Sequence, residues 1–202
     1  MSNSRRARKK ARNAPPPTAR AAVRRWFDGK LPLLLFVAKF FGLVALFYGL
    51  QLLPPCKHAI EAVTVGEARL AGLLLNVLGQ RNHVDGNVLW EGNRSVIAVV
   101  ESCSGFDFLS LFTAAVLVFP AAWRRKIAGI LVGLPLLMAL NLLRIMTLYI
   151  LGAHFSAGVF DIAHEDIWAI LLIACTIILY ILWIRWAGAD HLDHGDGVNV
   201  PT

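Results

Sequence analysis

The sequence predicts an all-α membrane protein with about four transmembrane helices, a small periplasmic amphipathic helix and a β-hairpin insertion. Hydrophobic residues make up 57% of the 202 residues and charged residues only 16%, less charge than soluble domains of this length contain. The mean hydropathy is +0.60, and the apolar residues occur in long blocks. Four blocks are long enough to span a bilayer: Leu31 to Leu53, about Ser104 to Ala122, Ile127 to Gly152 and about Ile167 to Trp186.

Each block is expected to be a helix, because about 20 apolar residues in helical form cross the hydrocarbon and backbone polar groups must be satisfied there internally. The second block is the shortest. The first is too long for the apolar region of a signal peptide, and no small-residue cleavage site follows it, so we expect it to remain as an anchor. Residues 31–186 are therefore interpreted as one membrane domain.

Two polar segments flank this domain. Residues 1–30 contain ten Lys or Arg and three consecutive prolines, which predicts a disordered basic cytoplasmic arm. Such an arm can bind nucleic acid, but contact with anionic lipid explains it more simply, and no nucleic-acid partner is expected. Residues 187–202 contain the run DHLDHGD, which could bind a metal. A solvated cytoplasmic tail is the favoured interpretation, and neither a metal nor a cofactor is expected.

The distribution of basic residues predicts the orientation of the chain. With four spans, the N-terminal arm, the cluster Arg124–Lys126 and Arg185 all fall on one side of the membrane. Both termini are therefore expected in the cytoplasm, with Cys103 near the outer face of the membrane. The opposite side has Lys57, Arg69, Arg81 and Arg94.

The segment from His58 to Gly79, between the first two blocks, is amphipathic. It contains Glu61, Glu67 and Arg69, which favours a helix at the membrane interface or outer surface. A fifth span is the alternative, and it would reverse the orientation of every later segment.

Turn signals follow at Asp85-Gly86 and Glu91-Gly92-Asn93, and Val96 to Val100 is rich in β-branched residues. This pattern predicts a short strand pair that leads directly to Cys103.

Cys103 lies in VVESCSGFDFLSLF, at the start of the second block. Ser104 and Gly105 are favourable at a helix start, so the thiol is expected at an outward-facing helix N-terminus, where the dipole favours a thiolate. Gly105 would also let another backbone approach closely. The alternative is an ordinary buried cysteine. The other two cysteines, Cys56 and Cys175, are expected to be dispensable.

Arg144 lies inside the third block, about 10 Å below its outer end near Ile150. A charge at that depth costs several kcal/mol and should face a polar interior with a partner. Asn141 and Thr147 are three residues away on either side, on the same helix face. The alternative to a functional arginine is a structural ion pair with Asp107.

His164 lies in FDIAHEDIW, at the outer entrance to the fourth block. Asp161 is a candidate cap for this helix, and Glu165 and Asp166 lie in its first turn. The alternative is an ordinary interfacial histidine, and His154 is a weaker candidate on the same loop.

The three residues come from different helices, and the predicted topology brings all of them to the outer leaflet. Cysteine as nucleophile, histidine as acid–base and arginine as oxyanion stabiliser form a set suited to acyl transfer.

Four motifs occur in order along the chain: Cys103-Ser104-Gly105, FPAAWRRKIAG at Phe119 to Gly129, NLLRI at Asn141 to Ile145 and FDIAH at Phe160 to His164. With these motifs the sequence resembles the exosortase/archaeosortase family of membrane cysteine transpeptidases, most closely the short exosortase H type, over about Leu31 to Trp186. The resemblance implies a site at the outer face of a bacterial inner membrane. The resemblance implies a catalytic triad of Cys103, Arg144 and His164. It also implies cleavage of exported proteins at a C-terminal sorting signal of motif, hydrophobic helix and basic cluster, and transfer to an acceptor through a thioester. Asn141, Asp107 and Gly105 are candidate supporting residues.

Two alternatives remain open from the sequence. The protein could be a non-catalytic membrane assembly or binding subunit with a structural Arg144. It could also be an intramembrane serine protease of the rhomboid kind that uses Ser104 and a histidine, although this leaves Cys103 and Arg144 without a function.

Overall fold

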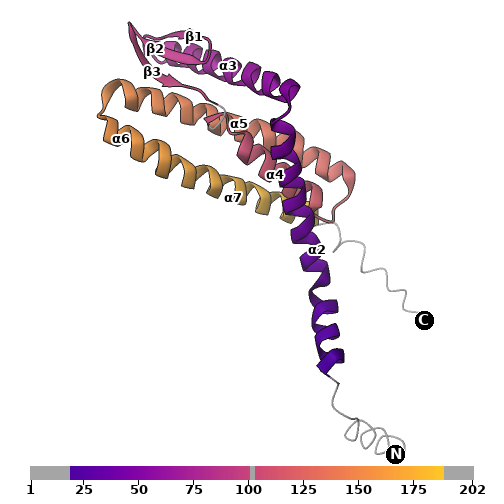
Figure 1. The fold of residues 1–202 in the computed structure, drawn as a ribbon. Coiled ribbons are helices and arrows are strands. Elements are labelled where there is room, and N and C mark those ends of the chain that lie inside the picture. Colours follow the sequence, from indigo (N-terminus) through magenta and orange to yellow (C-terminus); the bar gives the residue numbers. More distant parts are fainter. Residues whose placement is uncertain (1–18, 101–102, 189–202) are drawn as a thin grey trace, which may run out of the picture. The chain divides into compact units, whose positions relative to one another are not determined.

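The structure, a computed structural model, describes residues 19–100 and 103–188, with side chains from Lys30 onward. Most of these residues are helical (Figure 1). Residues up to Lys39 form one compact unit and residues from Phe40 form a second. Helix α2 (Ala19–Gln51) begins in the first unit and ends in the second. It therefore starts at Ala19 rather than at the predicted Leu31, and only residues 1–18 of the predicted arm lie outside the described residues.

Among the described residues, three helical segments are long and apolar enough to cross a membrane, which makes this a multi-pass membrane protein. They are Lys30–Gln51, Trp123–His154 and Ala157–Gly188. The second predicted span differs, because helix α4 (Phe106–Val118) has only 13 residues and is about 20 Å long. Phe119, which precedes Pro120, is extended and ends the helix there.

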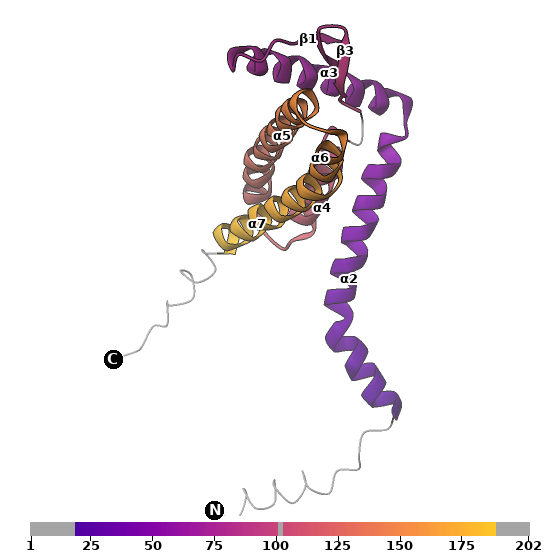
Figure 2. The same ribbon diagram turned by 90° about the vertical axis from the view of Figure 1, so that its left-hand side faces the viewer.

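The second unit is built around helix α5 (Trp123–His154), which lies beside α4 and α7 (Trp168–Gly188) (Figures 1 and 2). The short helix α6 (Ala157–Asp161) and the π-helix η2 (Ile162–Ile167) lead into α7 and extend its line by more than two turns before the predicted start at Ile167. These elements place the loop after α5 and the start of α7 at the same end of the bundle.

Helix α3 (Pro54–Val77) forms where the sequence predicts an amphipathic helix, with prolines in its first turn. It is not among the segments apolar enough to span, which argues against a fifth span. Its inner face packs on α5 and on the sheet (Figure 2). A buried core joins α3, the sheet, α5 and the start of α7, and it includes Ala71, Leu89, Leu148 and Trp168.

The predicted hairpin is part of a three-stranded antiparallel sheet in the order β1 (His83–Asp85), β2 (Val88–Glu91), β3 (Arg94–Ala98). Both connections are two-residue loops that begin with a glycine at positive φ, +59° at Gly86 and +57° at Gly92. Glycine at this position suits the twist of tight hairpins, so both turn signals are confirmed. The sequence missed β1, which has only three residues.

A second core closes the other end of the bundle, where Phe112, Leu137 and Trp183 pack together. Gly133 of α5 lies directly against the ring of Phe112, and a Cβ atom there would overlap it. Glycine at this position therefore allows α4 to approach α5 closely.

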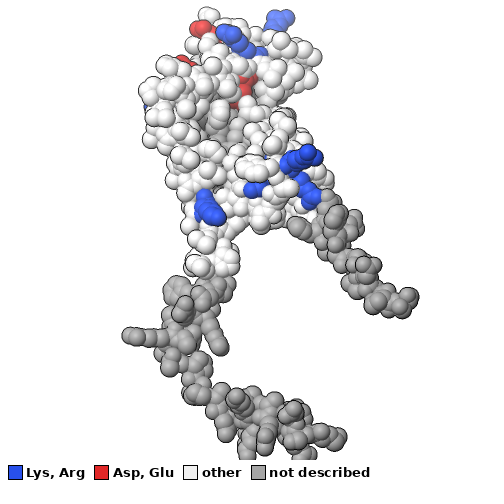
Figure 3. Space-filling model, turned by 90° about the vertical axis from the view of Figure 1, so that its right-hand side faces the viewer, with Lys and Arg blue, Asp and Glu red and all other residues white. Residues whose placement is uncertain are grey.

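The basic cluster Arg124–Lys126 lies at this second end and binds the ends of two helices. Arg125 donates a hydrogen bond to the carbonyl of Ala187 in α7, and Lys126 Nζ donates to the carbonyl of Leu117 in α4 at 2.6 Å. Cations at helix C-termini are favourable because carbonyls there lack helical partners. On the face drawn in Figure 3, the visible acidic side chains lie toward the opposite end of the second unit, where the sheet lies.

Candidate active site

Cys103 lies on the connection between β3 and α4, and its exit from the sheet is fixed by backbone hydrogen bonds. The Val99 N–H donates to the carbonyl of Asn87 at 2.8 Å, and Asn87 Nδ2 donates back to the carbonyl of Val99 at 2.9 Å. The Cys103 N–H donates to the carbonyl of Val100 at 2.8 Å. The side chain of Cys103 is buried, with 5% of its surface exposed. Residues 101 and 102, including Glu101, lie outside the described residues.

Gly105 forms the N-terminal cap of α4, with a φ of +73°. A Cβ atom at this position would lie 3.1 Å from the side-chain carbon of Asn141. The close neighbour is therefore an amide side chain and not the backbone that the sequence led us to expect. Both the positive φ and this contact favour glycine.

His164 reaches Cys103 from the π-helix η2. Its Nε2 atom lies 3.1 Å from Cys103 Sγ, in hydrogen-bond contact. The imidazole stacks on the ring of Phe160, with centroids 5.7 Å apart and planes 7° apart. The predicted cap is wrong, because the Asp161 side chain makes no capping hydrogen bond. His154 contacts Gln80 Oε1 at 2.9 Å instead of the thiol.

Arg144 is buried on α5, with 6% of its surface exposed. Its charge interacts with the ring of His164. Its Nε atom has no hydrogen-bond partner within the described part of the chain. The structural ion pair with Asp107 is absent among the described residues, because Asp107 interacts with the Tyr48 hydroxyl. The guanidinium is therefore a buried cation with hydrogen-bond donors left over, which normally requires an anionic partner.

Asn141 and Thr147 were predicted to share the face of Arg144, but only Asn141 belongs to the site. Its side chain is 1% exposed, and Nδ2 donates to the carbonyl of Cys103 at 3.0 Å. The Thr147 hydroxyl instead donates to the carbonyl of Leu143 in its own helix at 2.8 Å. The amide therefore links α5 to the backbone of the thiol-bearing residue.

The structure adds one residue that the sequence analysis did not select, Glu67 of α3. Its Oε1 atom accepts a hydrogen bond from Asn141 Nδ2 at 3.1 Å, and the residue is 6% exposed. Burial raises the pKa of its carboxyl group to about 7, while the bond from Asn141 acts in the opposite direction. The sequence spacing could have indicated that Glu67 is buried, because it lies three residues after Thr64 and four before Ala71, on the face of α3 that is buried.

Together these contacts gather a thiol, an imidazole and a buried guanidinium from three separate elements. The thiol and imidazole can exchange a proton, and the cation can stabilise negative charge formed beside them. None of the three cysteines, all of which lie within the described residues, forms a disulfide, so the thiol of Cys103 is available.

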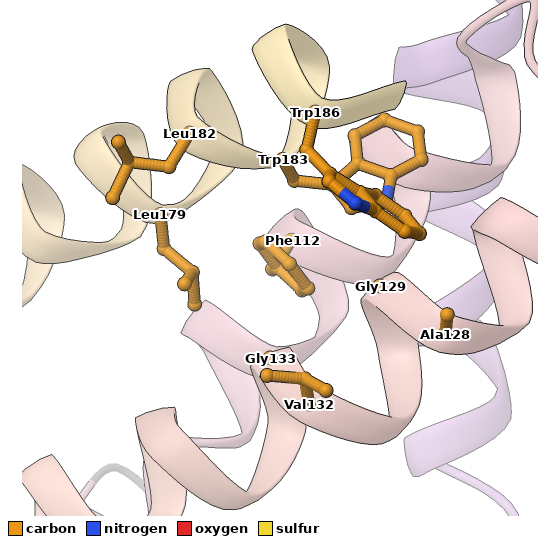
Figure 4. Close-up of a pocket in the computed structure, with 9 residues that line it drawn as sticks. All are labelled: Phe112, Ala128, Gly129, Val132, Gly133, Leu179, Leu182, Trp183 and Trp186. Carbon is orange, nitrogen blue, oxygen red and sulfur yellow. The ribbon is translucent and has the colours of Figure 1, made fainter. Parts of the chain in front are cut away.

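A separate apolar cavity of about 250 Å³ lies between α4, α5 and α7 (Figure 4). It reaches α5 at Gly133, eleven residues before Arg144, which is roughly 16 Å along the helix. No titratable side chain lines it, so it does not belong to the site around Cys103. Its lining consists of Phe112, Ala128, Gly129, Val132, Gly133, Leu179, Leu182, Trp183 and Trp186.

Comparison with known families identifies the chain. The model of the transmembrane exosortase family (Exosortase_EpsH) matches residues 32–181. The chain belongs to the transmembrane exosortase family. The expected family is thus confirmed over most of the length. No curated protein and no solved structure matches this exosortase.

The matched region begins within α2 and ends within α7 of the exosortase. It includes all five residues of the site, which are Glu67, Cys103, Asn141, Arg144 and His164. The whole site therefore lies within the part of the chain that matches the family model.

Proposed function

We propose that this exosortase is a membrane cysteine peptidase and transpeptidase. It cleaves exported proteins at a C-terminal sorting signal and transfers them to an acceptor through a thioester. The observation that supports this most directly is the 3.1 Å contact between Cys103 Sγ and His164 Nε2, beside the buried Arg144. Acyl transfer requires a nucleophile within hydrogen-bond distance of a base, and a cation that can stabilise the oxyanion.

In the acylation half of this mechanism, His164 takes the proton of the Cys103 thiol. The thiolate then attacks the carbonyl carbon of the scissile peptide bond, and its oxygen becomes an oxyanion. Arg144, whose Nε atom has no partner in the described structure, donates to that oxyanion. The imidazolium returns the proton to the leaving nitrogen, the C–N bond breaks, and the C-terminal fragment departs as an amine.

In the second half, an acceptor with a nucleophilic N–H or O–H group replaces the departed amine. His164 removes its proton as it attacks the thioester carbonyl, and Arg144 again stabilises the oxyanion. Collapse of this intermediate releases Cys103 as a thiolate, which regains the proton from His164. Asn141 does not act on the oxyanion, because its two N–H groups are already bound to Cys103 and Glu67.

The proposed location is the outer face of a bacterial inner membrane, with both termini in the cytoplasm. The basic cluster Arg124–Lys126 supports this, because it lies at the opposite end of α5 from Arg144. This topology requires α4, although shorter than a full span, to return the chain from Cys103 to the basic cluster, and the hydrogen bond from Lys126 to Leu117 supports it. The partners would be exported proteins with this C-terminal sorting signal, whose hydrophobic helix would lie in the lipid bilayer with the basic cluster on the cytoplasmic side.

The test is a comparison of exported proteins from cells that produce the wild type, Cys103→Ala or Ser104→Ala. Mass spectrometry of C-terminal peptides reports whether the sorting signal has been removed. We expect Cys103→Ala to retain the uncleaved signal although the variant is inserted at normal levels, and Ser104→Ala to retain substantial cleavage. Normal cleavage by Cys103→Ala would refute the proposal, and loss of cleavage only in Ser104→Ala would favour the serine alternative.

A further inference from the structure

Two buried oxygen atoms next to the site have no hydrogen-bond partner in the described structure, Glu67 Oε2 and Asn141 Oδ1. They belong to adjoining groups, because Glu67 Oε1 already accepts a hydrogen bond from Asn141 Nδ2 at 3.1 Å. In each of these two planar groups, one atom takes part in the hydrogen bond between them and the other, an oxygen, has no partner. A buried carboxylate and a buried amide oxygen without donors are costly.

The orientation of the Asn141 amide is fixed by its two acceptors. Nδ2 has two hydrogens, and one goes to Glu67 Oε1 and the other to the carbonyl of Cys103 at 3.0 Å. A flipped amide would direct its oxygen at two acceptors and lose both bonds. Gly105 packs against the same amide and leaves it little space to move.

We propose that Glu67 acts as a neutral acid that positions the nucleophile: its protonated Oε2 donates to Asn141 Oδ1 and closes a reciprocal acid–amide pair, which holds the backbone of Cys103. One proton satisfies both orphan oxygens. The pair resembles a carboxylic acid–amide dimer, in which each group donates one hydrogen bond and accepts one. This rests on the proposed function only in taking Cys103 as the nucleophile.

The protonation state agrees with the surroundings of Glu67. Burial raises the pKa of its carboxyl group to about 7, and a hydrogen bond available only to the acid would favour the proton further. No ion pair joins Glu67 to a basic side chain among the described residues. Glu67 is surrounded by ionisable groups from its own helix, from the elements packed on it and from the site. They are Cys56, Lys57, His58, Glu61 and Arg69 of α3; Arg124, Arg125, Lys126, Arg144, Tyr149 and His154 of α5; His83 and Asp85 of β1; Glu91 of β2; and Cys103 and His164 of the site.

The experiment measures the rate at which iodoacetamide alkylates Cys103 in membranes between pH 5 and 9. The full chain is used with Cys56→Ser and Cys175→Ser, so that Cys103 is the only thiol. Glu67→Gln preserves the shape and supplies an N–H where the acid supplies an O–H. Glu67→Leu removes both bonds but fills the space. Glu61→Gln is the matched control, because Glu61 lies on the same helix with 74% of its side chain exposed.

We expect Glu67→Gln to match the wild type at low pH and Glu67→Leu to differ from both by about tenfold, because both hydrogen bonds of the pair are lost. As pH rises past about 7, ionisation of Glu67 should slow alkylation in the wild type relative to Glu67→Gln. All other residues are the same in the two proteins, so the ratio of their alkylation rates reports the group at position 67. Glu61→Gln should follow the wild type throughout.

Two outcomes would overturn the inference. One is a ratio of wild type to Glu67→Gln that stays constant with pH. The other is a Glu67→Gln variant that fails to fold or is altered as much as Glu67→Leu, because the carboxylate would then be the required form. The alkylation assay needs no substrate, so its failure leaves the cleavage test of Cys103→Ala unaffected, and failure of that test leaves the alkylation result unaffected.

Discussion

His164 Nε2 lies 3.1 Å from Cys103 Sγ although 61 positions separate the two residues in the chain. The contact joins the turn before α4 to the π-helix before α7. The turn is hydrogen-bonded to α5 through Asn141, and α6 and α7, on either side of the π-helix, both pack on α5. A proton can pass between sulfur and nitrogen without a water molecule between them. The stacked ring of Phe160 limits the imidazole to this direction.

Replacing His164 with alanine should lower cleavage of exported proteins by about 10²- to 10⁴-fold, the usual effect of losing a general acid–base. His154→Ala is the control, because His154 contacts Gln80 and not the thiol. Quantitative mass spectrometry of C-terminal peptides measures both variants. Equal cleavage by the two would show that His164 does not transfer the proton.

Arg144→Lys should be far more damaging than its conserved charge suggests. Lysine lacks the planar donors of the guanidinium, so cleavage should fall by about 10²- to 10³-fold while the protein remains folded. Asp107→Asn should keep normal cleavage and melting temperature, because Asp107 interacts with Tyr48 and not with Arg144. The opposite pattern, with mild Arg144→Lys and destabilised Asp107→Asn, would restore the structural interpretation of Arg144.

Gly105→Ala should destabilise the folded protein by about 1–2 kcal/mol from the positive φ alone. It should also lower the alkylation rate of Cys103, because the new methyl group presses on Asn141. Gly66→Ala is the matched control within α3: no atom lies within 4 Å of its Cβ position, and alanine favours a helix by about 0.5–1 kcal/mol. Thermal unfolding in detergent compares them, and a harmless Gly105→Ala would contradict the described packing.

Glu67 should make stability depend on pH. Its pKa is raised from 4.5 to about 7 in the folded protein, so the folded state binds the proton more tightly than the unfolded state. The stabilisation from this group is therefore complete below about pH 4.5, decreases as pH rises to about 7, and is absent above. The melting temperature of the wild type should fall relative to that of Glu67→Gln across this interval. A difference independent of pH would mean that Glu67 titrates normally.

The parts of the fold that the sequence predicted best are those with strong local signals. The long apolar block of α5, the hairpin glycines and the amphipathic pattern of α3 each indicate one structure without knowledge of the partners. The length of α4 was overestimated, although Pro120 already limited it. Apolar composition continues past the helix end, so hydrophobicity alone does not reveal where helical hydrogen bonding stops.

The sequence could predict which side of the membrane the site residues share, but not how close their side chains lie. Predicted spans bring Cys103, Arg144 and His164 to one side of the membrane, but their distances depend on packing. Glu67 was overlooked because the same pattern in α3 suits a lipid surface as well as a protein interior. The partner of Asp107 was equally undetermined, since Arg144 and Tyr48 both lie in apolar blocks and only the packed structure distinguishes them.

The π-helix η2, from Ile162 to Ile167, lies within one continuous helical segment and sets how the residues before it are rotated about the helix axis relative to α7. A π-helix accommodates one more residue than an α-helix over the same rise. If the same six residues instead wound as an ordinary α-helix, everything before them would be rotated by about 100° relative to α7. Trp168 and Leu172 would keep their packing, but His164 would turn away from the sulfur. In this segment the winding of the backbone determines whether the imidazole faces the thiol.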